Sequence, residues 1–249
     1  MVDVVVLAFA RPDARYAGGL DLGGTGLQFP HPGAVVRDAV ARLHRNNPGT
    51  RVLLGIGGQT YGSWAALDTG AIALLVGDLG LDGVDVDFEP ADPRCVANAD
   101  GVRCMSDGAW KSALERLRAA PPRPAMLSVP GWSVGAFGAG PWRDARPRGP
   151  WTGSMLAPLR DPGMAAVDLV SVMAYGAGAG FDATRAYAAY RAAWPGALLG
   201  GVSVAAGTPA MATQDGLMIY GWLTRPPPGA PDAPAIAMAA CRAWRATCE

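Results

Sequence analysis

The segment LDGVDVDFEP, residues 81–90, places acidic residues at alternate positions: Asp85, Asp87 and Glu89. The residues that precede and separate them are valines and a phenylalanine, which favour β-strands. Because successive side chains of a strand point to opposite faces, the three carboxyl groups share one face, about 6–7 Å apart in succession. Mutual repulsion and loss of water both raise a carboxyl pKa, so we expect the row to hold at least one proton. Such a row suits a general acid.

Two structural explanations compete with a catalytic one for this acidic row. A buried ion-pair network would need arginine partners, which the sequence does not identify. A metal site would need further ligands, and the four cysteines have no histidine or cysteine neighbours at the spacing of zinc ligands. We therefore favour function over structure and expect no metal and no cofactor. Asp82 has the opposite parity, and a turn or entry contact at the strand start is its expected role.

Apolar runs that alternate with helical patterns indicate the elements that carry the row. In residues 33–46, apolar residues follow i, i+3, i+4 spacing, and NNPG then ends the helix. The expected strands cover residues 2–10, 51–57, 82–89, 125–130, 167–175, 197–205 and 215–221. The expected helices cover residues 33–46, 64–79, 107–119, 183–193 and 233–246. Strand–helix alternation with short links implies a parallel sheet.

This many strand–helix units favour an α/β barrel of the (β/α)8, or TIM, type over an open sheet. The pattern contains seven recognisable strands, so we expect an incomplete barrel. The chain has 249 residues, half of them hydrophobic and without an evident linker, so residues 1–249 are expected to form a single domain. Catalytic groups of such barrels lie at the carboxyl ends of the strands. The acidic face then lines the interior, with Glu89 at the mouth and the apolar face against the helices.

The pattern D-x-x-D-x-D-x-E, which begins at Asp82, resembles the signature of glycoside hydrolase family 18, here of the bacterial or viral type. The family contains chitinases, endo-β-N-acetylglucosaminidases and related non-catalytic lectins. RVLLGIGG (51–58) is similar to the family's third strand, DLVSVMAYGAG (168–178) to its sixth, and GLMIYGW (216–222) to its eighth. The resemblance covers nearly the whole chain, with the segments in the right order.

The resemblance implies a substrate-assisted mechanism, an exception to the usual two-carboxylate scheme of glycosidases. Glu89 would protonate the glycosidic oxygen while the substrate's own 2-acetamido carbonyl attacks the anomeric carbon. Asp87 would orient the acetamido nitrogen and share a proton with Glu89, and Asp85 would hold a second proton deeper in the row. Tyr175 would hydrogen-bond the acetamido oxygen, and Met173 would line the floor of the site.

Several positions depart from the family's pattern. Gly55 stands where the family usually has Ser, and the family's first strand, which usually supplies a Tyr, is not recognisable. Both groups normally hydrogen-bond the carboxylate at the position of Asp85, so we expect Asp85 to be easier to protonate or wetter. Either the first strand lies upstream of Met1, or the barrel has a gap that exposes strand edges. Because Gly176 also replaces an Asp that contacts the sugar, we expect weak or altered hydrolysis.

The expected sugar-binding residues are glycines and aromatic residues near strand ends. The resemblance places Gly57 and Gly58 at the end of the family's third strand. Tyr220 stands at the position of the Trp under the −1 sugar, where its smaller ring can still stack, and Trp222 has the same parity. Trp132 and Trp222 are the tryptophans that we favour as cleft residues, with core packing as the alternative. The other tryptophans near strand ends are Trp64, Trp142 and Trp151, with core packing expected above all for Trp64.

Composition excludes several other classes of function. The 21 basic and 21 acidic residues give zero net charge without a basic cluster, so no nucleic acid is expected as a partner. No apolar run is long enough to cross a bilayer, so no membrane is expected either. The glycine-rich DLGGTG (21–26) does not follow a buried strand directly, which favours a plain loop over a phosphate site. Neither histidine has a Ser or Cys elbow nearby, which argues against a catalytic triad.

The four cysteines hint at an oxidising compartment. A disulfide between Cys95 and Cys104 would staple the loop between them, although the sequence leaves their state open. Cys241 and Cys248 could bridge only if the last helix ended between them. The first residues lack a basic start and a cleavage site, so we do not expect them to act as a signal peptide. The even number of cysteines agrees with secretion, and the location stays unassigned.

Three functions remain open at this point. The first is a monomeric retaining hydrolase that acts on an N-acetylglucosamine-containing polysaccharide, such as chitin or chito-oligosaccharides. The second is a chitinase-like carbohydrate-binding protein with weak or no turnover, against which the intact Glu89 argues. The third is an endo-β-N-acetylglucosaminidase acting on glycans, or hydrolysis of peptidoglycan-type sugars. Loop shape decides among these substrates.

Overall fold

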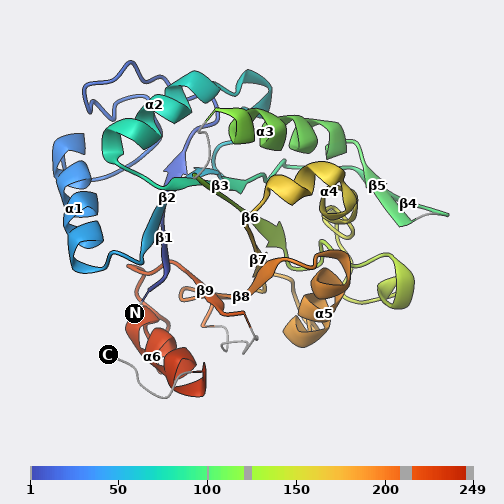
Figure 1. Cartoon of the computed structure of the whole chain (residues 1–249). Helices are drawn as coiled ribbons and strands as arrows, with labels where there is room; N and C mark the ends of the chain where they lie inside the picture. Colours follow the sequence, from blue (N-terminus) through green and yellow to red (C-terminus); the bar gives the residue numbers. More distant parts are fainter. Residues whose placement is uncertain (1, 100, 121–124, 208–214, 245–249) are drawn as a thin grey trace.

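The structure is a computed structural model of the chain and describes residues 2–99, 101–120, 125–207 and 215–244. Seven parallel strands form one sheet that curls into a half-barrel, and helices lie around its outside (Figure 1). In order across the sheet, the strands are β1 (Val4–Ala10), β2 (Arg51–Gly57), β3 (Gly83–Asp87), β6 (Met126–Trp132), β7 (Leu169–Met173), β8 (Ala197–Ser203) and β9 (Leu217–Tyr220). The strands predicted from the sequence are all present. The prediction of an incomplete TIM barrel is therefore confirmed.

The helices follow the strands in sequence, as a barrel of strand–helix units requires. They are α1 (Gly33–Asn46), α2 (Thr69–Leu79), α3 (Asp107–Ala119), α4 (Leu156–Arg160), α5 (Ala183–Ala193) and α6 (Ala233–Trp244). Three of them have the bounds predicted from the sequence: α1, α3 and α5. No helix in the described ranges is long and apolar enough to cross a membrane. The last predicted helix extends to residue 246, and residues 245–246 lie outside the described part, as does Cys248 of the second cysteine pair.

The predicted helix 64–79 was wrong over its first residues. A short 3-10 turn covers Trp64–Ala66, and α2 starts only at Thr69. Asp68 precedes it as the N-cap and accepts a hydrogen bond from the Ala71 N–H at 2.9 Å. Because a capping carboxylate satisfies an N–H that has no partner inside the helix, it sets the helix start there.

Strand β3 separates its side chains into two faces, as the sequence alternation predicts. Val84, Val86 and Phe88 are buried in the main hydrophobic core, which also contains the apolar face of α2. Asp85 lies on the opposite face and contacts Ser128 of β6 inside the half-barrel. Burial of the apolar face therefore turns the acidic face inward.

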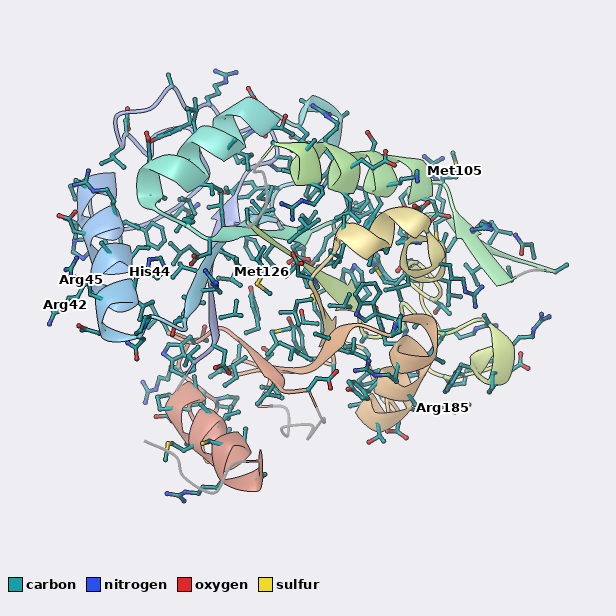
Figure 2. The ribbon with its side chains drawn as sticks, viewed as in Figure 1. Arg42, His44, Arg45, Met105, Met126 and Arg185 are labelled. Atoms are coloured by element: carbon teal, nitrogen blue, oxygen red, sulfur yellow. A yellow bond between two sulfur atoms is a disulfide. The ribbon has the colours of Figure 1, made fainter. Side chains whose placement is uncertain are left out.

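Asp82 holds the start of β3. Its carboxylate accepts a hydrogen bond from the Val52 N–H at 2.7 Å and lies 3.2 Å from Arg51 Nη1. His44 Nε2 lies 2.9 Å from the same carboxylate. Figure 2 shows His44 on α1, on the side of the helix that faces the strands. Asp82 thus joins α1, β2 and β3 at the entry of the strand, and the expected entry contact is confirmed.

A hairpin that the sequence analysis did not predict follows β3. Its strands, β4 (Cys95–Asn98) and β5 (Gly101–Cys104), are antiparallel, and Cys95 and Cys104 form a disulfide. The hairpin projects away from the half-barrel in Figure 1, and Met105, labelled in Figure 2, lies at its base next to α3. The disulfide that the sequence left open is therefore present.

The half-barrel has two edge strands, β1 and β9, which do not pair with each other in the described part of the chain. A Cβ added at Gly55 of β2 would lie 3.0 Å from Val6 Cγ1, so Val6 faces the same interior as Gly55. Its exposure is nonetheless 39 %. The inner face of β1 is therefore open to solvent at the gap between the two edges.

Tyr190 of α5 fixes the end of β6. It is fully buried, and its hydroxyl donates a hydrogen bond to the Trp132 carbonyl at 2.6 Å. A Cβ added at Gly131 or Gly135 would lie 2.5 Å from this hydroxyl, so only glycine leaves room for it at either position. Helix α5 thus holds the strand end that carries Trp132.

We expect Tyr190→Phe to lower the free energy of unfolding by about 1 kcal/mol, because the buried Trp132 carbonyl loses one of its two hydrogen-bond donors. Urea unfolding followed by circular dichroism measures the change. Tyr187→Phe is the matched control, because the Tyr187 hydroxyl is partly exposed and lies 3.4 Å from its backbone acceptor. Equal losses in the two variants would contradict the role given to Tyr190.

Candidate active site

The three predicted carboxyl groups lie in one row at the carboxyl end of β3. In the sheet register, Asp85 is paired with Gly55 of β2 and with Ser128 of β6. Asp87 is only 5 % exposed, whereas Asp85 and Glu89 keep part of their surface accessible. The row therefore runs from the interior of the half-barrel to its mouth, with its most buried member in the middle.

Ser128 is in direct contact with the row, and the sequence analysis missed it. Its hydroxyl donates a hydrogen bond to Asp85 Oδ1. A signal for it exists in the sequence, because β6 is the neighbour of β3, and a residue at the matching register shares the inner face. The donor that Gly55 cannot supply is thus supplied by the strand on the other side.

Burial controls the protonation of the row. It raises the pKa of Asp85 to about 6, and the hydrogen bond from Ser128 acts in the opposite direction. Burial also raises the pKa of Asp87 well above its usual range, with further contributions from the charges of Glu89 and Asp85. The pKa of Glu89 is raised by burial as well. These directions agree with the expectation that the row holds a proton.

Asp87 and Glu89 share a hydrogen bond. The bond raises the pKa of Asp87 and lowers that of Glu89, as when a protonated Asp87 donates to Glu89. The Oδ1 atom of Asp87 is buried and accepts no hydrogen bond from the described residues. Because a buried acceptor without a donor is costly, this oxygen is suited to receive an N–H or O–H from a bound molecule.

Two tyrosines from neighbouring parts of the mouth lie beside the row. Tyr175 follows β7 and stacks on Tyr220 of β9, with ring centroids 5.8 Å apart and an angle of 14° between the planes. Burial raises the pKa of Tyr175, and the charge of Asp87 is the next cause, so its hydroxyl lies within electrostatic reach of the row. Tyr220 is 47 % exposed, and its ring is therefore open to a ligand. Met173, at the end of β7, is buried.

The tryptophans divide between mouth and core. Trp132 stacks on Trp151 at 4.1 Å and 19°, and both are partly buried. Trp222 follows β9 and is exposed. Trp64 is buried against Phe88, with ring centroids 5.0 Å apart, so the expectation of core packing is confirmed for Trp64. A contact of Trp132 or Trp222 with a sugar stays a prediction.

Gly57 and Gly58 lie buried at the end of β2 and act on the row through the backbone. Both have positive φ, 97° and 65°. The Gly58 N–H donates to the Asp87 carbonyl at 2.9 Å, and a Cβ added at Gly57 would lie 2.3 Å from that same oxygen. Glycine is required because the chain turns there against the backbone of β3. The structure gives both residues a positioning role, and a direct contact with substrate stays a prediction.

A basic side chain or a metal ion near the row would compete with protons for its carboxyl groups. In the described ranges, no ion pair joins these three carboxyl groups to a basic side chain, as an ion-pair network would require. No group of three or more metal-ligating side chains occurs in that part of the chain either. The arrangement is therefore suited to proton donation and to accepting hydrogen bonds from a ligand.

Comparison with solved structures shows the fold. The chitinase from Rhizomucor miehei superposes with a TM-score of 0.54 at 20 % identity, over 81 % of this chain and 62 % of that one. A GH18 chitinase from Cycas revoluta in complex with (GlcNAc)3 gives 0.52 at 20 % identity, over 81 % and 61 %. Human YKL-39, a pseudo-chitinase with retained chitooligosaccharide binding, gives 0.54 at 10 % identity, over 81 % and 58 %.

The chain thus spans about three-fifths of the length of these solved proteins. No protein-family model and no curated protein sequence matches it. The likeness is therefore one of architecture: chitinases and chitinase-like proteins have the same curled sheet with surrounding helices. Because enzymes and binding proteins both appear among them, chemistry has to be argued from the side chains at the mouth.

We expect Asp85→Asn to raise the free energy of unfolding at pH 7 by on the order of 2 kcal/mol. The pKa of Asp85 is raised from 3.8 to about 6 in the folded chain, so the folded state binds more protons than the unfolded state between these values. Wild-type stability therefore falls as pH rises through this window, whereas asparagine carries no charge and can still accept from Ser128.

Chemical denaturation of wild type and variant at pH 7 and near pH 4 measures this difference. The gain is expected to shrink toward the lower pH, where the wild-type carboxyl group is protonated. Asp38→Asn, at an exposed carboxylate of α1, is the control and should show no such trend. A gain of equal size at both pH values would show that burial of charge is not its cause.

Proposed function

We propose that this protein is a retaining glycoside hydrolase that cleaves β-1,4-linked N-acetylglucosamine polymers, such as chitin or chito-oligosaccharides. The observation that carries the proposal is the hydrogen-bonded pair of Asp87 and Glu89 at the mouth, with a buried Asp87 oxygen to which none of the described residues donates. A pair that holds a proton supplies a general acid, and the free oxygen fits the N–H of a 2-acetamido group. Among sugar substituents, an acetamido group offers both this N–H and a nucleophilic carbonyl oxygen.

The chemistry proceeds in two steps from these groups. Glu89 gives its proton to the glycosidic oxygen, while the acetamido carbonyl oxygen attacks the anomeric carbon and the leaving sugar departs. This forms a cyclic oxazolinium, whose positive charge is stabilised by Asp87, which is ionised because it passed its proton to Glu89 before Glu89 gave that proton to the glycosidic oxygen. Glu89 then takes a proton from water as the water opens the ring, which restores the configuration of the starting sugar.

Tyr175 and the aromatic residues would position the sugar in this reaction. The Tyr175 hydroxyl lies near the row and stays protonated because its pKa is raised, so it can donate to the acetamido oxygen. Tyr220 presents an exposed ring for stacking on a pyranose face, and Met173 closes the floor below. Trp132 and Trp222 are proposed to extend the binding surface. The bound (GlcNAc)3 in the structurally similar Cycas protein supports this choice of ligand class.

A second candidate is a carbohydrate-binding protein with weak or no turnover. The open edge between β1 and β9, together with glycine at positions 55 and 176, leaves fewer groups around the sugar than a closed barrel would provide. The similarity to the pseudo-chitinase YKL-39 also supports this candidate. The complete acidic row favours hydrolysis, because a binding protein has no use for a buried proton donor.

We expect Glu89→Gln to lower kcat/KM on a chromogenic chitobiose or chitotriose glycoside by roughly 10²–10⁴-fold, the usual contribution of a general acid. Glutamine has the same shape but cannot donate the proton, so the affinity for chitotriose should persist. Chromophore release and isothermal titration calorimetry give the two numbers. Wild-type activity that survives this substitution would rule out Glu89 as the acid, and binding without any release by wild type would support the second candidate.

We expect Tyr220→Ala to weaken chitotriose binding by about 5- to 30-fold, because an exposed aromatic platform contributes roughly 1–2 kcal/mol to stacking. Calorimetric titration of the wild type and the variant measures the loss. Leu74→Ala is the matched control, since Leu74 is an exposed apolar residue on α2, outside the mouth. If Tyr220→Ala binds as tightly as wild type, the sugar does not lie on this ring.

A further inference from the structure

Asp85, the first carboxyl group of the row, has one hydrogen-bond donor among the described residues. Ser128 of β6 lies at the matching register position and donates its hydroxyl to Asp85 Oδ1. Ser128 is itself buried, at 3 % exposure, so water does not compete for the hydroxyl. A buried hydroxyl next to a partly buried carboxylate is held by that contact, because the hydroxyl alone would lack a partner.

The neighbour on the other side of Asp85 cannot provide such a donor. Gly55 of β2 is in register with Asp85 and has no side chain. A Cβ at that position would lie 3.0 Å from Val6 Cγ1 and 3.1 Å from Ala8 Cβ, so β1 crowds the space that a side chain would need. The close contact of β1 and β2 therefore leaves β6 as the strand that supports Asp85.

We propose that Ser128 is a positioning residue that holds Asp85 ionised and so keeps the proton of the row on Asp87, next to Glu89. This inference rests on the proposed role of the row in proton donation. The hydroxyl donates to the charged form of Asp85 and favours that form. An ionised Asp85 then repels a charge on Asp87, and Asp87 retains the proton that it donates to Glu89.

The other groups around Asp85 cannot replace this contact. The titratable groups that act on it are Asp87 of its own strand and Tyr175 at the end of β7. Asp87 holds the proton in this arrangement, and Tyr175 carries no charge at neutral pH, so neither group favours the ionised form of Asp85. Burial raises the pKa of Asp85, and the hydrogen bond from Ser128 is the opposing influence. Without the hydroxyl, the proton is expected to move down the row from Asp87 to Asp85.

The test follows the Asp85 carboxyl carbon by ¹³C NMR in aspartate-labelled protein, with its resonance assigned by its loss in Asp85→Asn. Ser128→Ala is expected to move the titration midpoint of this carbon up by about one pH unit, the usual effect of removing a donor from a carboxylate. Ser128→Thr keeps the hydroxyl and should retain the wild-type midpoint. Ser154→Ala removes another buried serine hydroxyl, one without a hydrogen-bond partner, and should leave the midpoint unchanged.

The kinetic arm uses the same variants with a chromogenic chito-oligosaccharide. Ser128→Ala is expected to move the acidic limb of kcat/KM to higher pH by a similar amount, while KM at the optimum changes by less than about twofold. A merely structural serine would alter stability or KM and leave the limb in place. Restoration of the wild-type limb by Ser128→Thr supports the hydroxyl as the cause.

The two arms separate the inference from the proposed function. An unchanged Asp85 midpoint in Ser128→Ala overturns the role of Ser128, whatever the activity. A shifted midpoint in a protein that releases no product supports the role of Ser128 and overturns hydrolysis as the proposed function. The Asp85 midpoint could also shift while the acidic limb of the kcat/KM profile stays in place. That result would show that the charge of Asp85 does not control proton donation by Glu89, and it would overturn this part of the inference.

Discussion

Repulsion within a buried row of carboxyl groups is the constraint on which the rest of this site depends. Three such groups can share one face of a strand only if protons and donors offset the charge that burial concentrates. Here the pKa values of Asp87 and Glu89 are both raised, which favours a proton on the pair, and Ser128 donates to Asp85. The backbone of β2 also contacts the row. Strand β2 ends in glycines, which let the Gly58 N–H donate a hydrogen bond to the Asp87 carbonyl.

The position of β3 in the sheet explains how an incomplete barrel can keep this row intact. Strand β3 lies between β2 and β6, away from both open edges. Its hydrogen-bonding neighbours are therefore present, and its outward residues are buried under α2. The gap instead adjoins β9, which carries Tyr220. Incomplete closure therefore affects the surroundings of Tyr220 more than those of the acidic row.

Periodicity in the sequence was sufficient for most of the fold. The apolar runs predicted every strand of the large sheet, because parallel strands buried on both faces are nearly continuous hydrophobic segments. The β4–β5 hairpin was missed because its short strands, CVAN and GVRC, show no clear alternation and depend on a covalent link. The start of α2 was misplaced because Asp68 caps it after an apolar turn that continues the helical pattern.

For the candidate site, the sequence identified the row but not its partners. Alternation places Asp85, Asp87 and Glu89 on one face without any knowledge of the fold. The contact with Ser128 depends on which strands are neighbours and on their register, and both are properties of the assembled sheet. The stacking of Tyr175 on Tyr220 likewise joins residues from separate strands. Such contacts between strands are outside the reach of local patterns.

The disulfide hairpin determines what a proteolytic cut near the mouth of the half-barrel would do to the chain. Cys95 and Cys104 are nine positions apart and close a covalent ring in the hairpin that follows β3. The ring projects from the body of the molecule, where proteases find their substrates most easily. A cut inside the ring would leave both new ends tethered by sulfur. The strand that carries Glu89 and the helix that follows it would then remain one molecule after the backbone between them has been severed.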